Sequence, residues 1–230
     1  MSPSLLLTRP EADSRRFLAA VEGALGRPVE AVISPLLRIV PLTPPLPQGV
    51  AGVVVTSANG AAALARLGVD RQRPIWAVGD RTAQVAAEDG YAARSAGGDA
   101  DALVALLLHE RPPGPLLHLR GADSRGAVAR RLAEGGLRCE EAVCYRQEAQ
   151  PLSADATARL AAPGPVVAPV FSPRTGTLLA AQGPFAAALT LVCLSAAVAA
   201  EVHTLSAAVV TAARPDLDAM VTGTVLALSP

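Results

Sequence analysis

The chain alternates short apolar runs with longer segments in which apolar residues recur at helical spacing. The first run, Leu5-Leu6-Leu7, is followed by Thr8-Arg9-Pro10 and then by a helical pattern over residues 12–25. Pro10 and Glu11 suit the start of a helix, because proline fits the first turn and a carboxylate is stabilised at the positive end of the helix dipole. The N-terminal segment therefore predicts a strand, a polar turn and a helix.

This order recurs along the whole chain. Apolar runs predict further strands at residues 29–33, 38–40, 53–55, 74–78, 116–119 and 139–145. Further helices are predicted at residues 61–68, 83–89, 100–109 and 124–134, and residues 185–202 match a strand followed by a helix. Proline-rich segments at residues 41–47 and 111–115 interrupt the pattern, because proline lacks a backbone donor. Strands that alternate with helices are typical of parallel α/β sheets.

Polar residues follow the strand predicted at residues 53–55. Thr56-Ser57-Ala58-Asn59 separates this strand from the next helix and so lies at the carboxyl edge of the sheet, where ligands of such folds usually bind. The free N–H groups at the start of a helix favour an anion. The segment is a candidate anion cradle; the alternative is that Thr56 or Ser57 only caps its helix.

An internal repeat predicts that the fold is duplicated. Leu5-Leu6 with Arg9 matches Leu116-Leu117 with Arg120, and residues 12–15 recur identically as residues 122–125. Val29-Glu30 is aligned with Cys139-Glu140. At an offset of 115, residues 55–59 align with residues 170–174, and residues 77–80 with residues 192–195. The chain is therefore interpreted as two kinds of repeated segment, A and B, that each occur twice in the order A, B, A, B.

The composition argues against several functional classes. All twenty basic residues are arginines, so a Schiff-base lysine and the lysine of a Walker phosphate loop are excluded. Aromatic residues make up only 3% of the chain and the formal net charge is +0, which argues against nucleic-acid binding. No G-x-G-x-x-G follows a strand, which argues against a dinucleotide-dependent enzyme.

The cysteines and histidines give no metal motif. Cys139, Cys144 and Cys193 are an odd number without ligand spacing, and the three histidines are scattered. Reduced thiols in the cytoplasm are the simplest interpretation. The N-terminus lacks the pattern of a signal peptide, and no segment has the pattern of a membrane span. We therefore expect a cytoplasmic protein that binds no metal and no membrane.

Six short motifs occur in a fixed order along nearly the whole chain. They are Thr8-Arg9-Pro10, Thr56-Ser57-Ala58-Asn59, Ala77-Val78-Gly79-Asp80-Arg81-Thr82-Ala83, Leu119-Arg120-Gly121, Val143-Cys144-Tyr145-Arg146 and Phe171-Ser172-Pro173. Their order resembles that of the uroporphyrinogen-III synthase family. The resemblance implies two parallel-sheet α/β domains, joined by a two-stranded linker, with a ligand cleft between them. The implied bounds are residues 1–37 plus 150–230, residues 43–142, and linker strands at residues 38–42 and 143–149.

The resemblance also implies an activity. Members cyclise hydroxymethylbilane, a linear tetrapyrrole, to uroporphyrinogen III, with inversion of ring D and loss of water, in haem, sirohaem and cobalamin biosynthesis. Neither a cofactor nor a metal is implied. We further expect a monomer that receives its substrate from hydroxymethylbilane synthase and binds no nucleic acid. The competing interpretation is a non-catalytic two-domain clamp for an anionic small molecule.

The resemblance implies roles for particular residues. Tyr145 is the candidate general acid for departure of the hydroxyl group, and its alternative is a ring that packs between domains. Thr82 would contribute a hydroxyl group to the substrate or only to the first helical turn. For the arginines the alternative is pairing with Asp13 or Asp123, and for the serines it is capping. The candidate substrate-binding residues are Arg9, Thr56, Ser57, Ala58, Asn59, Gly79, Thr82, Arg120 and Ser172.

The last quarter of the chain departs from the family pattern. The repeat alignment places Leu194 and Ala197 where a glycine and a threonine are expected. Bulk at Leu194 is expected to close the backbone cradle, which would leave this joint with a structural role only.

Overall fold

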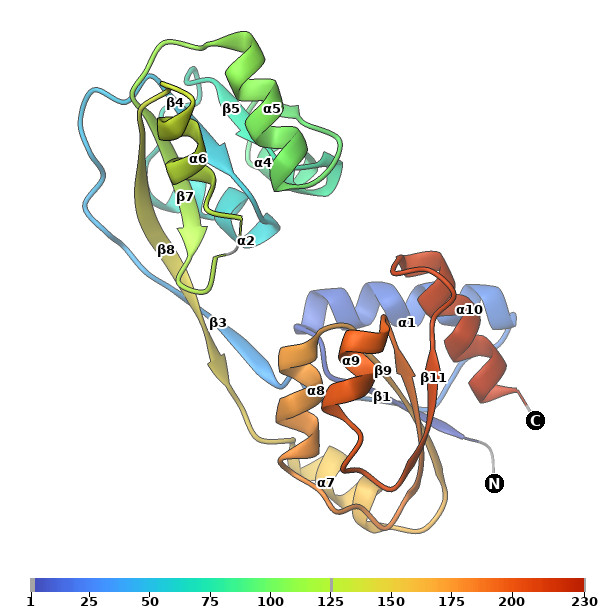
Figure 1. Ribbon diagram of the computed structural model, residues 1–230. Coiled ribbons are helices and arrows are strands. Elements are labelled where there is room, and N and C mark those ends of the chain that lie inside the picture. The colour runs from blue at the N-terminus through green and yellow to red at the C-terminus, as the bar shows by residue number, and fades with distance from the viewer. Residues whose placement is uncertain (1–2, 125, 230) are drawn as a thin grey trace. The chain divides into compact units, whose positions relative to one another are not determined.

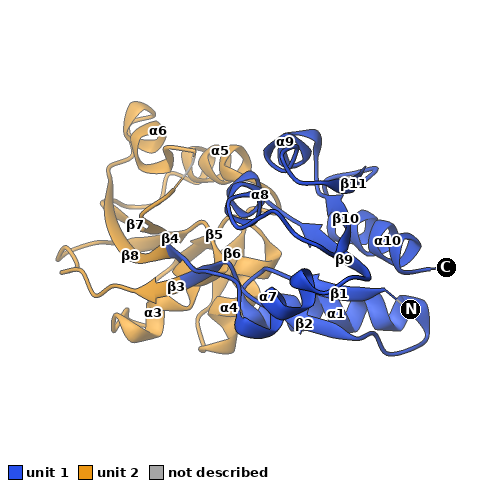
Figure 2. Ribbon diagram, turned by 90° about the horizontal axis from the view of Figure 1, so that it is seen from below, with its two compact units in different colours: residues 1–38, 148–230 blue, residues 39–147 orange. Residues whose placement is uncertain are grey.

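The computed structural model describes residues 3–124 and 126–229. The chain divides into two compact units, which Figure 2 colours separately: unit 1 is Met1–Arg38 with Glu148–Pro230, and unit 2 is Ile39–Gln147. In each unit, helices cover both faces of a sheet (Figure 1). The domain bounds expected from the family resemblance, and the cleft expected between the domains, stay predictions.

The sheet of unit 1 has the strand order β11-β10-β9-β1-β2, and its paired strands are parallel. These strands are β1 (Ser4–Leu7), β2 (Ala31–Ile33), β9 (Pro165–Val170), β10 (Ala188–Cys193) and β11 (Ala207–Thr211). One face packs against α1 (Glu11–Leu25) and α10 (Leu217–Leu228). The other face packs against α7 (Ala154–Ala161), α8 (Pro173–Ala180) and α9 (Ala196–Glu201).

The six-stranded sheet of unit 2 has the order β3-β8-β7-β4-β5-β6. Its strands are β3 (Leu37–Pro41), β4 (Gly52–Val55), β5 (Ile75–Ala77), β6 (Ala93–Ser95), β7 (Leu116–Gly121) and β8 (Cys139–Ala149). Side chains alternate between the faces of a strand. Val53 and Val55 therefore pack with α2 (Ala58–Ala61), α3 (Ala63–Arg66) and α4 (Asp80–Glu88). Val54 packs on the opposite face with α5 (Ala100–Glu110) and α6 (Val128–Glu134).

The parallel α/β class predicted from the sequence is confirmed. One helix was predicted too long, because residues 124–134 become helical only from Val128. The two preceding residues, Gly126 and Ala127, have φ angles of 87° and 44°, which a right-handed helix does not accept. Residues 122–124 of the second copy of the repeated tetrapeptide therefore lie before a helix, whereas the first copy lies inside α1. Arg125 lies outside the described residues.

The two sheets have corresponding strand orders, β2-β1-β9-β10-β11 in unit 1 and β8-β7-β4-β5-β6 in unit 2. This correspondence agrees with the predicted duplication, which stays a prediction. The register corrects one detail of the sequence alignment. Leu5 pairs with Ala31 and Leu116 pairs with Cys139, so Ala31, and not Val29, corresponds to Cys139.

Candidate active site

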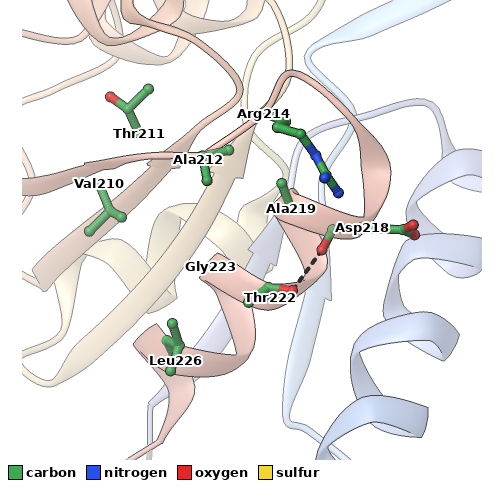
Figure 3. Close-up of a pocket in the computed structure, with 10 residues that line it drawn as sticks. Val210, Thr211, Ala212, Arg214, Asp218, Ala219, Thr222, Gly223 and Leu226 are labelled. Atoms are coloured by element: carbon green, nitrogen blue, oxygen red, sulfur yellow. Dashed lines mark hydrogen bonds between the residues drawn. The ribbon is translucent and has the colours of Figure 1, made fainter.

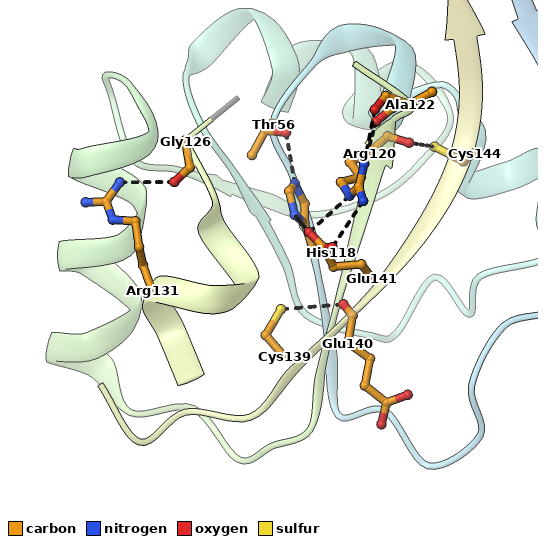
Figure 4. Close-up of polar contacts among 11 residues, drawn as sticks. Thr56, His118, Arg120, Ala122, Gly126, Arg131, Cys139, Glu140, Glu141 and Cys144 are labelled. Atoms are coloured by element: carbon orange, nitrogen blue, oxygen red, sulfur yellow. Dashed lines mark hydrogen bonds and ion pairs between the residues drawn. The ribbon is translucent and has the colours of Figure 1, made fainter. Parts of the chain in front are cut away.

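Polar side chains from three neighbouring strands meet near the carboxyl edge of the sheet of unit 2 (Figure 4). Thr56 directly follows β4, His118 and Arg120 belong to β7, and Glu141 belongs to β8. In the sheet register, His118 pairs with Val54 on one side and with Glu141 on the other. Because residues two apart on a strand share a face, these four polar side chains project from the same face.

The four side chains form a connected polar cluster. Thr56 Oγ1 lies 3.0 Å from His118 Nε2, and His118 Nδ1 lies 3.5 Å from Glu141 Oε1. Arg120 Nε is 3.0 Å from Glu141 Oε1, and Arg120 Nη2 is 3.2 Å from Glu141 Oε2. His118 Nδ1 and Arg120 Nε are buried and lack a partner in good hydrogen-bond geometry among the described residues, so the attraction between Arg120 Nε and Glu141 is mainly that of charge.

The histidine of this cluster is neutral near pH 7. His118 is 0% exposed, and this burial lowers its pKa from 6.5 to about 4, although the nearby Glu141 opposes the shift. Burial disfavours the charged imidazolium because the interior solvates charge poorly. His118 therefore acts as a hydrogen-bonding group and not as a cation.

A second contact links two of the predicted residues, Ser57 and Tyr145. Ser57 caps α2, since its Oγ accepts the Gly60 N–H at 3.0 Å, and the same Oγ lies 3.0 Å from the Tyr145 hydroxyl oxygen. The ring of Tyr145 lies against Gly121, where a Cβ atom would come within 2.6–2.8 Å of ring atoms. Glycine at position 121 thus makes room for the ring beside the end of β7.

These groups line a pocket of about 260 Å³ within unit 2. The structure therefore brings three of the predicted residues together at one cavity, Thr56, Ser57 and Tyr145. Ala58 and Asn59 form the start of α2, directly after the capping serine. The described lining residues are Thr56, Ser57, Val78, Ala100, Gly121, Asp123, Ser124 and Tyr145.

Gly79 and Thr82 lie at a second hollow, of about 330 Å³, which shares Val78 with the first. Gly79 is the N-cap of α4, and a Cβ atom there would lie 3.3 Å from the carbonyl oxygen of Gly98. Thr82 is buried in the first turn of α4. The place of Thr82 in the first helical turn agrees with a purely structural role. Its place on the lining of the hollow agrees with a contact to the substrate.

The remaining candidates already have protein partners. Arg9 lies 3.4 Å from Asp13 and stacks 4.3 Å above the ring of Phe171, and burial lowers the pKa of this guanidinium from its ordinary value. Arg120 is bound to Glu141 as described. Ser172 caps α8, because its Oγ accepts the Thr175 N–H at 3.1 Å. The pairing alternative for Arg9 and the capping alternative for Ser172 are thus present in the structure.

The assignment of Leu194 and Ala197 to the positions of Gly79 and Thr82 is wrong. The Leu194 N–H donates to Val170, and the Val78 N–H donates to Val55, so Leu194 corresponds to Val78. The N-caps Gly79 and Ser195 correspond to each other, which places Val198 opposite Thr82. Leu194 consequently does not fill a backbone cradle. The departures lie instead at Ser195, where a glycine is expected, and at Val198, whose buried apolar side chain packs into the core of unit 1.

Sequence periodicity assigns no role to His118, because the three histidines are scattered along the chain. The available signal was a polar residue inside the apolar run Leu116–Leu119, since a buried polar side chain requires partners. The partner Glu141 is 23 residues away in sequence and is set beside His118 only by the sheet register. The register is a non-local property that periodicity does not reveal.

The described residues contain a further hollow of about 390 Å³ in unit 1, between β11 and α10 (Figure 3). Half of its ten described lining residues are alanine, valine or leucine, and none of the predicted site residues lies there. Within the same described residues, no three histidine, cysteine or acidic side chains are grouped as metal ligands. Among the helices of residues 3–124 and 126–229, none has both the length and the apolar character that a membrane span requires.

Comparison with known proteins identifies the family. A family model described as Uroporphyrinogen-III synthase HemD matches residues 19–222. The uroporphyrinogen-III synthetase of Helicobacter pylori 26695 is similar in fold, with a TM-score of 0.69 and 15% identity over 99% of this chain and 100% of that chain. A mutant uroporphyrinogen III synthase of the extremely thermophilic bacterium Thermus thermophilus has a TM-score of 0.50 and 19% identity over 98% of each chain. No curated protein sequence matches the chain. Because the family model spans most of its length, the chain belongs to the uroporphyrinogen-III synthase family.

Proposed function

We propose that this chain converts hydroxymethylbilane to uroporphyrinogen III, with inversion of ring D and loss of water. Its family consists of cyclising lyases of tetrapyrrole biosynthesis, which supports the substrate class. The observation that carries the proposal is the pocket of unit 2, where the hydroxyl groups of Thr56, Ser57 and Tyr145 meet. The alternative, a non-catalytic clamp for an anion, would not require a phenol beside the capping serine.

Tyr145 is the proposed general acid. Ser57 Oγ already accepts the Gly60 N–H, so its own proton is available to the Tyr145 oxygen, and the phenol proton is then available to the substrate. The C–O bond of the substrate's terminal hydroxymethyl group breaks, and the phenol proton joins the departing oxygen, so that water leaves. The proton lost from the substrate during ring closure restores the phenol. A positioned acid of this kind contributes about 10²–10⁴-fold to the rate.

The carboxylate arms of the substrate are proposed to bind at the predicted joints. The free N–H groups at the start of α2, by Ala58 and Asn59, and at the Gly79–Thr82 joint suit anions, because the helix dipole is positive there. Arg9, Arg120 and Ser172 are proposed as further contacts to these arms. We also propose that the protein is a cytoplasmic monomer, needs no cofactor or metal, and receives its substrate from hydroxymethylbilane synthase.

The test is an incubation with freshly prepared hydroxymethylbilane in the presence of a metal chelator. The products are oxidised and the type I and type III porphyrins are separated. Formation of type III supports the proposal, whereas the spontaneous type I isomer alone refutes it. Loss of type III only when the chelator is present refutes the metal-free mechanism.

Tyr145→Phe tests the proposed acid. We expect kcat to fall about 100-fold or more, while the free energy of unfolding changes by about 1 kcal/mol, the contribution of one hydrogen bond. The matched control is Tyr91→Phe, because the Tyr91 hydroxyl donates to Val69 in the core at 2.8 Å and does not line the pocket. The control should keep its turnover. An unchanged kcat in Tyr145→Phe removes this residue from the mechanism.

A further inference from the structure

The hydroxyl group of Thr56 contacts a histidine, His118, that has no role in the proposed reaction. His118 is fully buried on the face of the sheet covered by α5 and α6, and its Nε2 lies 3.0 Å from Thr56 Oγ1. Its other nitrogen, Nδ1, faces Glu141 Oε1 at 3.5 Å. The imidazole therefore connects a carboxylate on one side with a pocket-lining hydroxyl on the other.

Charge determines which nitrogen of His118 carries the proton. Glu141 is paired with Arg120, and an ionised carboxylate only accepts hydrogen bonds. A lone pair on Nδ1 would face this negative charge, whereas an Nδ1–H is attracted to it. The neutral imidazole has a single N–H, so Nε2 carries a lone pair. It follows that Thr56 Oγ1–H donates to Nε2.

A threonine hydroxyl has one proton to donate. Once this proton is directed at His118, only the oxygen lone pairs of Thr56 remain for the pocket. A group that binds there must itself be a donor. Hydroxymethylbilane has carboxylates, which accept hydrogen bonds, and pyrrole N–H groups, which donate them. Its other donor, the terminal hydroxyl group, leaves as water in the proposed reaction, so a contact that lasts through the reaction is made by a pyrrole N–H.

We infer that His118 and Glu141 are positioning residues that fix Thr56 as a hydrogen-bond acceptor, and that Thr56 binds a pyrrole N–H of the substrate and not one of its carboxylates. The inference deepens the proposed function and rests on it, because it names a group of that substrate. It assigns Thr56 a different task from the anion cradle predicted for residues 56–59.

The position of the proton can be measured without any substrate. The chain has only three histidines, so the ring ¹⁵N signals of the whole protein are few, and His118→Gln assigns those of His118. We expect a protonated Nδ1 and an unprotonated Nε2 throughout pH 6–8. A proton on Nε2 overturns the inference, whatever the enzyme assay gives.

Glu141→Gln should reverse the direction of the hydrogen bond between Thr56 and His118, because glutamine is uncharged but has almost the same shape as glutamate. The side-chain amide no longer repels a lone pair on Nδ1 and can donate to it, so the ring proton moves to Nε2 and the Thr56 hydroxyl proton turns to the pocket. We expect the KM for hydroxymethylbilane to rise about 3- to 10-fold, the effect of one hydrogen bond, with kcat nearly unchanged. The matched control is Glu140→Gln on the same strand, since Glu140 pairs with the exposed Arg138 at 2.7 Å. This control should keep the wild-type KM.

A double-mutant cycle separates positioning from general stabilisation. Thr56→Val removes the acceptor and should raise KM as much as Glu141→Gln does, whereas Thr56→Ser should restore it. In the Thr56→Val background, Glu141→Gln should add no further increase. Additive effects overturn the inference, as does a wild-type KM in a Glu141→Gln protein whose spectrum shows protonated Nε2. If the wild-type chain forms only the type I isomer, the proposed function and the substrate group named here are refuted together, while the spectrum still decides the polarity of Thr56.

Discussion

Burial of His118 predicts a specific loss of stability on the acid side of neutrality. The pKa of His118 falls from 6.5 to about 4 in the folded chain, because burial disfavours the imidazolium. Between these two values the unfolded chain binds a proton that the folded chain does not, so acid favours unfolding. The contribution of the buried, neutral His118 to the free energy of unfolding is fully present above pH 6.5 and is lost as the pH falls towards 4. The shift corresponds to about 3 kcal/mol, at about 1.4 kcal/mol per pKa unit.

The assay is urea unfolding at pH steps from 7.5 to 4, followed by the fluorescence of Trp76. This residue is the single tryptophan of the chain and is buried in unit 2, as His118 is, so its signal reports the relevant unit. His118→Gln removes the titrating ring. The difference in unfolding free energy between wild type and variant should change by about 3 kcal/mol over this pH range.

Comparison of pH slopes removes the packing cost of the substitution, because that cost does not depend on pH. The control variant His203→Gln replaces an exposed ring that contacts the Ala200 carbonyl oxygen, and it leaves His118 in place. It should therefore keep the acid-side loss. Equal slopes in wild type and His118→Gln would refute the reasoning, as would an NMR titration of His118 with a midpoint near 6.5.

Three further predictions follow from contacts near the pocket and at a helix start. Gly121→Ala should lower both turnover and stability, the latter by about 1–3 kcal/mol, because the new Cβ would come within 2.6–2.8 Å of the Tyr145 ring; calorimetry with an isomer assay checks this, and wild-type values for both contradict it. Ser57→Ala and Ser153→Ala should each lose about 1 kcal/mol of capping energy, because both serines cap a helix. Only Ser57→Ala should lose turnover, since its hydroxyl contacts Tyr145; equal turnover in the two variants argues against that contact in catalysis. Asp99→Asn should be less stable than wild type above pH 3.8, because two backbone N–H donors at the start of α5 lower the pKa of Asp99 in the folded chain. The difference in unfolding free energy should disappear as the pH falls through this lowered pKa, and a difference that does not depend on pH counts against the charged cap.

The sequence predicted the parallel α/β fold because its signals are local. The apolar runs, the polar residues that follow them and the helical spacing lie next to one another in the chain. The joint at residues 56–59 was located in this way, and Ser57 does cap its helix. The contact between Ser57 and Tyr145 joins residues 88 apart, and only the resemblance drew attention to that tyrosine.

The errors arose where the spacing along the chain differs between the two halves. A constant offset of 115 placed Leu194 opposite Gly79, whereas the hydrogen bonds of the strand ends shift this alignment by one residue. A one-residue shift moves every side chain of a strand to the other face. The cluster of Thr56, His118 and Glu141 was missed for a related reason, because three strands bring it together through their register.

The measurement that tests the central claim most directly is the isomer composition of the porphyrin product as a function of enzyme concentration. Freshly prepared hydroxymethylbilane closes spontaneously to the type I isomer, so the enzyme must compete with this reaction. The fraction of type III should rise with enzyme concentration until type III is the main product, and Tyr145→Phe should need a far higher concentration for the same fraction. A product that stays type I at every concentration of the wild-type chain would contradict the proposed activity.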